Sequence, residues 1–214
     1  MSAQPVTTEL VRQLREQTGA GIMDCKAALQ EAGGDFERAR DILRARGKAS
    51  AQKRSGRQTR EGLVEAYIHP GGRIGSLIEL NCESDFVART GPFQALAHDL
   101  AIQVAGTSAR WVSRERVPEA ELYRERAVYR EQAVQDGKSE DRLEQIVEGK
   151  LRKFYETFCL YDQAWLRDEG SKARRVQEVI QEVSAQTGEN VSVARFARFQ
   201  LGETVAEEAN RDGA

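Results

Sequence analysis

Two histidines and three cysteines are the residues of this 214-residue chain best suited to chemistry. His69 and His98 are the only imidazole bases, and neither stands beside a nucleophile in a recognisable motif, so a surface or structural role is the better interpretation. Cys25, Cys82 and Cys159 are odd in number and form no CxxC or Cys/His pattern. They predict small buried side chains in a reducing compartment, without a metal site.

The glycine-rich segments do not match the loops that hold phosphate groups. Residues 19–21 begin like a dinucleotide fingerprint, but Asp24 stands where the third glycine belongs and no strand precedes the segment. The Gly-Lys pairs at Gly47, Gly137 and Gly149 all lack the glycine five residues upstream that a P-loop needs. We therefore expect that the chain is not an enzyme and that it carries no cofactor and no metal.

Composition is that of an ordinary globular protein. The chain is 40% hydrophobic and 31% charged, with a net charge of −2 from 32 basic and 34 acidic residues. That balance does not favour nucleic acid as a direct partner. No apolar run approaches the roughly 18 residues of a membrane span, and the first nine residues lack the features of a secretory signal. We expect a cytoplasmic protein with no membrane partner.

The first fifty residues predict three short amphipathic helices separated by glycines. Thr7 or Thr8 caps the first helix, which stops at residues 19–21. Asp24 is expected to cap the second helix, and Gly47 to end the third. Helices this short are unstable in isolation, because the free-energy cost of helix nucleation exceeds the stabilisation that a few turns provide. They must pack on one another as a small bundle.

Residues 44–60, RARGKASAQKRSGRQTR, contain seven basic side chains and no acidic one. This composition predicts a linker that is helical in its first part. The alternative function is an RNA-binding module that uses this basic segment. Binding would then depend steeply on salt and would be lost when Arg54, Arg57 and Arg60 are neutralised.

Beyond the basic segment, the hydrophobic period changes from helical to alternating. Residues 63–69 and 74–82 predict an antiparallel hairpin, and residues 191–201 predict a further strand. Helices are expected from Pro92 to Gly106 and over residues 118–136, 139–158 and 172–186. Gly149 inside one of them costs about 1 kcal/mol relative to alanine, which indicates close packing there.

The predicted fold is α+β. It has four parts: an N-terminal three-helix module (1–50), a basic linker (51–60), a core of a short antiparallel sheet packed with helices (61–203) and an acidic tail (204–214).

The segment from Ser84 to Val87 connects the second strand to the next helix, and two interpretations stay open for it. In the first, Asp85 or Ser84 caps a helical turn while Phe86 packs into the core. In the second, the connection presents Phe86 to a partner, with a carboxylate beside the ring.

Four segments resemble, in the same order, the elongation factor Ts family. Residues 14–29 resemble its N-terminal signature. Residues 81–89 resemble its second signature, with Ser84 where the family usually has threonine. Residues 148–155 and 193–202 are similar to its later segments.

The resemblance implies a guanine-nucleotide exchange factor in translation elongation, whose partner is the GTPase elongation factor Tu. The N-terminal module would be ubiquitin-associated-like and would dock on the GTP-binding domain of that partner. Arg15, Ile22 and Met23 stand where the family has docking residues, and Ile22 replaces the usual methionine.

The same resemblance implies that the segment Ser84, Asp85, Phe86 and Val87 also binds the partner. Asp85 and Phe86 would reach towards the Mg²⁺ site of the GTPase and disturb metal and phosphate binding. Many members carry two core subdomains and a helical hairpin, whereas this chain has room for one subdomain. It therefore resembles the short-form members, which tend to be homodimers, and the helix over residues 118–136 is expected to be the remnant of the hairpin.

Overall fold

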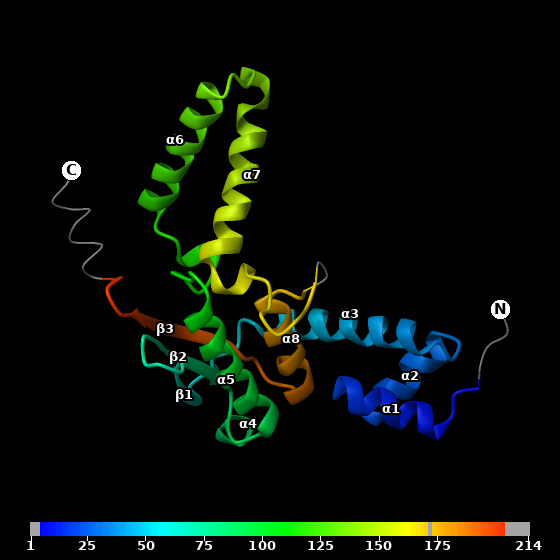
Figure 1. Cartoon of the computed structure of the whole chain (residues 1–214). Helices are drawn as coiled ribbons and strands as arrows, with labels where there is room; N and C mark the ends of the chain where they lie inside the picture. The colour runs from blue at the N-terminus through cyan, green and yellow to red at the C-terminus, as the bar shows by residue number, and fades with distance from the viewer. Residues whose placement is uncertain (1–4, 171–172, 204–214) are drawn as a thin grey trace. The chain divides into compact units, whose positions relative to one another are not determined.

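The computed structural model describes residues 5–170 and 173–203 and confirms the α+β class. Its three strands form one antiparallel sheet in the order β1-β2-β3. Figure 1 shows the elements, which in chain order are α1 (Thr8–Thr18), α2 (Ile22–Glu31), α3 (Phe36–Arg54), β1 (Glu61–Ile68), β2 (Ile74–Cys82), α4 (Asp85–Ala88), α5 (Gly91–Gly106), η1 (Arg114–Arg116), α6 (Glu119–Gln135), α7 (Glu140–Phe158), η2 (Leu160–Asp162), α8 (Val176–Thr187) and β3 (Ser192–Gln200).

The chain divides into two compact units. Unit 1 comprises residues 1–63, 80–96 and 178–192, and unit 2 comprises residues 64–79, 97–177 and 193–214. The predicted division into a module, a linker, a core and a tail stays a prediction, and the tail at 204–214 lies outside the described residues. Among the described helices, none is long and apolar enough to cross a membrane.

In unit 1, the first three helices pack into the small bundle that the sequence predicts. The Thr7 hydroxyl caps α1 by accepting the Leu10 N–H at 3.2 Å, and α1 ends at Gly19, whose φ is +66°. The shared core is made of the buried residues Val11, Leu14, Cys25, Ala28, Leu29, Ala32, Ala39 and Leu43. The likeness of this bundle to a ubiquitin-associated module stays a prediction.

Two predicted helix boundaries in this bundle are wrong. Gly21, and not Asp24, stands at the N-cap of α2, so Asp24 lies inside the first turn. The third helix does not stop at Gly47 but continues to Arg54. A Cβ at position 47 would lie 3.1 Å from the Cβ of Ala185 in α8. Gly47 therefore permits a close approach between α3 and α8, and packing offsets its low helix propensity.

In unit 2, α6 and α7 form a helical hairpin, and Figure 1 shows them side by side. The buried residues Leu143, Val147, Leu151 and Phe154 form the predicted seam of α7. The expected hairpin remnant is thus a complete two-helix hairpin. The close packing expected at Gly149 is wrong, because no described atom beyond its chain neighbours and its own helix backbone lies within 4 Å of the Cβ that alanine would add.

The strands and α5 follow the sequence closely. In β2, Ser76, Ile78, Leu80 and Cys82 are buried, whereas Leu77 between them is exposed. The predicted apolar face of α5 is buried throughout, as shown by Phe93, Leu96, Ala97, Leu100, Ala101 and Val104. The helix expected over 172–186 is α8, which begins at Val176, and Lys172 lies outside the described residues.

Candidate partner-binding site

The segment after β2 folds into the single helical turn α4. Val87 is buried on the inner side of this turn, and the Thr90 hydroxyl donates to the Val87 carbonyl at 2.8 Å. Ser84 stands at the N-cap position, but its side chain makes no capping hydrogen bond. Because Val87 is buried, it anchors the turn in this structure, and its contact with a partner stays a prediction.

Phe86 lies on the outer side of α4 with 78% of its surface exposed. The first interpretation of this segment is therefore right about a helical turn and wrong about burial of the ring. Beside the ring, the Asp85 carboxylate pairs with the Arg89 guanidinium at 2.6 Å. An exposed aromatic side chain next to a carboxylate is the feature that the second interpretation requires.

A buried thiol forms a hydrogen bond to the backbone that leads into α4. The Sγ of Cys82 donates to the Ser84 carbonyl at 3.1 Å. Burial, reinforced by the charge of Glu189, raises the pKa of Cys82 to about 11. The thiol therefore stays protonated near neutral pH and acts as a donor. Burial likewise raises the pKa of Cys25, and raises that of Cys159 to about 12.

The three predicted docking residues of the N-terminal module lie on neighbouring helices. Arg15 is exposed on α1, and Ile22 and Met23 are exposed in the first turn of α2. Met23 has 73% of its surface exposed and Ile22 has 53%. Ile22 and Met23 thus form a small exposed apolar surface on α2, whereas residues 84–87 form a second group on a different element.

The basic segment has partners inside unit 1. Arg44 pairs with Glu178 and Glu182 at 3.1 and 3.7 Å, Lys48 also pairs with Glu178, and Arg57 pairs with Glu83 at 3.3 Å. The Arg54 guanidinium donates to the Ser184 carbonyl at 3.1 Å. These internal contacts account for several of the basic side chains, and the RNA-binding alternative stays a prediction.

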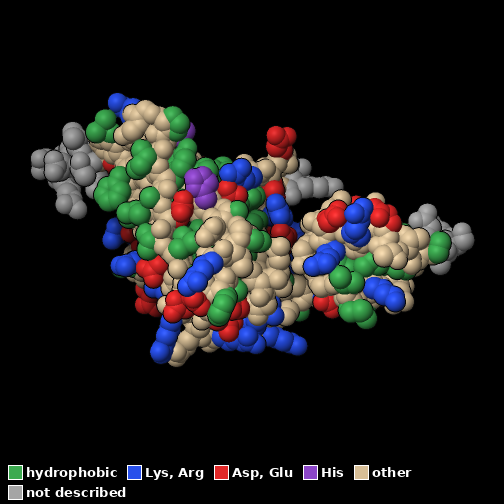
Figure 2. All heavy atoms as spheres, turned by 90° about the horizontal axis from the view of Figure 1, so that it is seen from below, with side chains coloured by type: hydrophobic (Ala, Val, Ile, Leu, Met, Phe, Trp, Pro, Cys, Tyr) green, Lys and Arg blue, Asp and Glu red, His purple; other side chains and the backbone are tan. Residues whose placement is uncertain are grey.

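One exposed surface was missed by the sequence reasoning. In unit 2, apolar side chains gather on the outer face of the sheet, and we call this the apolar sheet face. It comprises Val64, Ala66, Ile68, Leu77, Phe199 and Leu201. Figure 2 shows hydrophobic side chains gathered over the part of the chain that carries the sheet.

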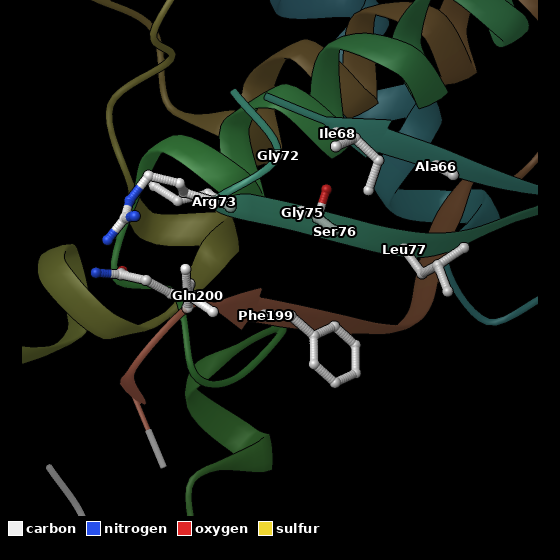
Figure 3. Close-up of a pocket in the computed structure, with 11 residues that line it drawn as sticks. Ala66, Ile68, Gly72, Arg73, Gly75, Ser76, Leu77, Phe199 and Gln200 are labelled. Atoms are coloured by element: carbon white, nitrogen blue, oxygen red, sulfur yellow. The ribbon is translucent and has the colours of Figure 1, made fainter. Parts of the chain in front are cut away.

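Several of these residues line a shallow hollow of about 490 Å³, and Figure 3 shows Ile68, Leu77 and Phe199 there, each contributed by a different strand. The signal was partly available in the sequence: β1 and β3 carry apolar residues on both sides, whereas the outer side of β2 has Leu77 as its one large apolar residue.

Neither histidine joins these surfaces as a reactive group. In unit 2, His98 Nδ1 lies 2.9 Å from a Glu65 carboxylate oxygen, and His69 Nδ1 lies 3.0 Å from the Tyr67 hydroxyl. Both imidazoles are exposed. Within the described ranges, no group of three or more histidine, cysteine or acidic side chains is arranged to hold a metal ion.

Comparison with known proteins places this sequence in one family. The family model described as elongation factor TS matches residues 37–203, which include α4, the sheet and the hairpin. The elongation factor Ts of Thermotoga neapolitana is 51% identical over 198 residues, which are 92% of this chain and 98% of that protein. The chain belongs to the elongation factor Ts family.

Other elongation factor Ts proteins give the same result. That of Syntrophomonas wolfei is 47% identical over 204 residues, covering 95% of this chain and 94% of that protein. That of Anaeromyxobacter dehalogenans is 50% identical over 198 residues, covering 92% of this chain and 89% of that protein. Since these alignments cover nearly the whole chain, they extend into the helices before residue 37. Membership gives this protein a role in translation elongation.

Proposed function

We propose that this member of the elongation factor Ts family is a guanine-nucleotide exchange factor that binds elongation factor Tu·GDP and promotes release of GDP. The observation that supports this proposal is the exposed ring of Phe86 on a turn whose inner side is buried. Phe86 enters the GTPase near its Mg²⁺ and phosphate site. Asp85 accompanies it and adds a negative charge where the nucleotide phosphates are held.

The energy available from burial of one ring is of the right order. A hundredfold loss of nucleotide affinity requires about 2.7 kcal/mol of coupling between the two ligands. Full burial of a phenylalanine side chain contributes roughly 1.5–3 kcal/mol. Mg²⁺ requires near-ideal octahedral geometry, so a small displacement of its surroundings weakens both the metal and the phosphates that it bridges.

The N-terminal module supplies affinity and alignment. Ile22 and Met23 present exposed apolar side chains that a hydrophobic groove on the GTP-binding domain can cover, with Arg15 at the edge. Docking there holds the factor on the GTPase while Phe86 acts. No bond is made or broken. GDP lowers the affinity of the GTPase for this protein by the same ratio by which this protein lowers its affinity for GDP, because linkage is reciprocal. This exchange takes place in the cytoplasm.

We also propose that the protein is a homodimer through the apolar sheet face. The occupant of this face is a second copy of the chain, since its apolar side chains form a patch that can pack against an identical patch. The charged residues on the same side of the sheet, Glu79 and Arg195, already pair with each other at 2.8 Å. This pairing offsets two charges on the face, and Arg73 adds a further cation to the lining of the hollow.

The proposed exchange activity is tested by GDP release from elongation factor Tu loaded with fluorescent GDP. Stopped-flow traces are recorded with and without the purified chain, in the presence of excess unlabelled GDP. We expect release to accelerate and to saturate with factor concentration. Spontaneous and factor-containing traces that coincide would rule the proposal out. Light scattering at micromolar concentration tests the dimer, and a monomer mass would reject it.

A further inference from the structure

The chain that leads into α4 is held by a carboxylate from a distant part of the sequence. Glu189 lies in the turn after α8, in the same unit as α4. Its carboxylate accepts the backbone N–H groups of Glu83 and Ser84, each at 3.0 Å, and the Ser84 hydroxyl at 2.5 Å. Hydrogen bonds to an ionised acceptor are stronger than neutral ones, and here three converge on one side chain.

A second carboxylate makes the connection reciprocal. Glu83 accepts the backbone N–H of Asn190 at 2.6 Å and the Arg57 guanidinium at 3.3 Å. The Asn190 side chain donates to the carbonyls of Ser55 and Arg57 at 3.3 and 2.9 Å. The turn that carries Glu189 is therefore fixed to the segment after α3 as well as to the segment before α4.

The turn itself is also fixed to α8. The buried Ser184 hydroxyl donates to the Glu189 carbonyl at 2.5 Å. Glu189 consequently has little freedom to follow a moving α4, and its carboxylate acts as a fixed acceptor for residues 83 and 84.

This fixation matters because α4 cannot define its own position. A single helical turn is unstable in isolation, since the free-energy cost of helix nucleation exceeds the stabilisation from one turn. The exposed Phe86 ring has few contacts of its own that could orient it, so its direction is set by the backbone of residues 84–88. A ring held in its bound direction before the encounter avoids the entropy cost of ordering it during binding.

We propose that Glu189 is a positioning residue for nucleotide exchange: it fixes the Ser84–Asp85 backbone so that Phe86 projects towards the GTPase before the two proteins meet. This inference rests on the proposed exchange function. Glu189 does not touch the nucleotide or the metal. It acts through Ser84, whose hydroxyl and N–H both bind its carboxylate.

The test compares four full-length variants with the native chain: Glu189→Ala, Glu189→Gln, Ser84→Ala and Glu178→Ala. Glu178 is the matched control, because its carboxylate binds Arg44 and Lys48 in the same unit. The maximal rate of factor-stimulated GDP release and the half-saturating factor concentration are measured separately. Thermal unfolding is followed for each variant.

Glu189→Ala removes all three hydrogen bonds, and part of their free energy is then needed to order residues 83 and 84 on binding. We expect the maximal rate to fall about tenfold and the half-saturating concentration to change by less than about twofold. The half-saturating concentration should change little because Ile22 and Met23 still dock on the GTPase. Glu189→Gln should stay within about threefold of native, since its amide oxygen accepts the two N–H groups and the Ser84 hydroxyl can accept from its NH₂. Ser84→Ala should fall between these two variants, and Glu178→Ala should match the native rate.

Hydrogen exchange supplies a readout that does not depend on activity. In Glu189→Ala the amides of residues 83–88 should exchange faster, while those of the α1–α3 bundle keep their protection. The inference is overturned if Glu189→Ala exchanges GDP at the native maximal rate, or if glutamine and alanine at this position are equally impaired. A native chain that fails to accelerate GDP release would instead remove the proposed function, and hydrogen exchange would still show whether Glu189 orders residues 83–88.

Discussion

Phe86 and Phe199 are two phenylalanines of similar exposure in very different surroundings. Phe86 has 78% of its surface exposed and Phe199 has 68%. Phe86 stands on one helical turn in unit 1, beside the Asp85–Arg89 ion pair. Phe199 stands on β3 in unit 2, among the other side chains of the apolar sheet face.

The difference shows that exposure alone does not assign a role to an aromatic side chain. A single ring on a short turn fixed by hydrogen bonds can enter a narrow cleft and disturb what lies inside it. A ring within a broad apolar face can only add area to a flat contact. We therefore assign Phe86 to nucleotide exchange and Phe199 to association of two copies, and each assignment predicts what the other residue should leave unchanged.

The largest effect is expected for Phe199→Asp. In a twofold contact the substitution places a carboxylate in each copy of the interface, and burial of an unpaired charge costs several kcal/mol. We expect dimerisation to weaken by at least about a hundredfold, measured by sedimentation equilibrium across a range of concentrations. Phe86→Asp is the matched control, and its dimer should persist. A Phe199→Asp dimer of native affinity would show that the apolar sheet face is not the interface.

The next effect is expected for Phe86→Ala. Loss of the ring removes roughly 1.5–3 kcal/mol of apolar burial, which corresponds to a decrease of about 10- to 100-fold in the maximal rate of stimulated GDP release. Because the ring is exposed in the free protein, its unfolding temperature should stay within about 2 °C of native. Phe199→Ala should release GDP normally in the same stopped-flow assay. Equal rates for Phe86→Ala and the native chain would contradict the role of the ring.

A smaller effect is expected for Met23→Asp on α2. The charge opposes burial of one apolar side chain, while Ile22 and Arg15 still contact the partner. We expect the affinity for elongation factor Tu to fall about tenfold by calorimetry, equivalent to about 1.4 kcal/mol. At saturating concentration the release rate should return to native, since Phe86 is intact. A rate that stays low at saturation would mean that the module does more than dock.

Local signals predicted much of this fold. Hydrophobic spacing predicted the helices of the bundle, the apolar face of α5 and the seam of α7. It could do so because the 3.6-residue repeat of a helix is visible within a short stretch of sequence. A helix in the first part of the basic segment was predicted, but its continuity with α3 through Gly47 was not, because the packing of Gly47 against the distant Ala185 is not visible in local sequence. Close packing at Gly149 was predicted from a cost in propensity alone, and the structure shows no neighbour there.

The candidate site was harder to predict, because its decisive contacts are not local. Residues 84–87 could either bury or present Phe86, and the same residue types suit both outcomes. The choice depends in part on Glu189, which lies 105 residues away from Ser84 in the sequence. The apolar sheet face had a visible pattern, but alternation does not reveal which of the two faces α-helices leave uncovered.

The smallest effect is expected for Gly149→Ala, which lies on neither surface and tests whether stability and function are separate. Gly149 is exposed within α7, and no described atom would meet the added methyl group. Alanine should therefore stabilise the helix by about 0.5–1 kcal/mol and raise the unfolding temperature by about 1–4 °C.

Gly19→Ala is the matched control, because φ is +66° there and the new Cβ would lie 2.5 Å from the Gln186 side chain, so it should destabilise the protein. If Gly149→Ala is more stable yet releases GDP and dimerises as the native chain does, losses at Phe86 and Phe199 cannot be attributed to stability. A changed rate in Gly149→Ala would instead connect the α6–α7 hairpin to exchange.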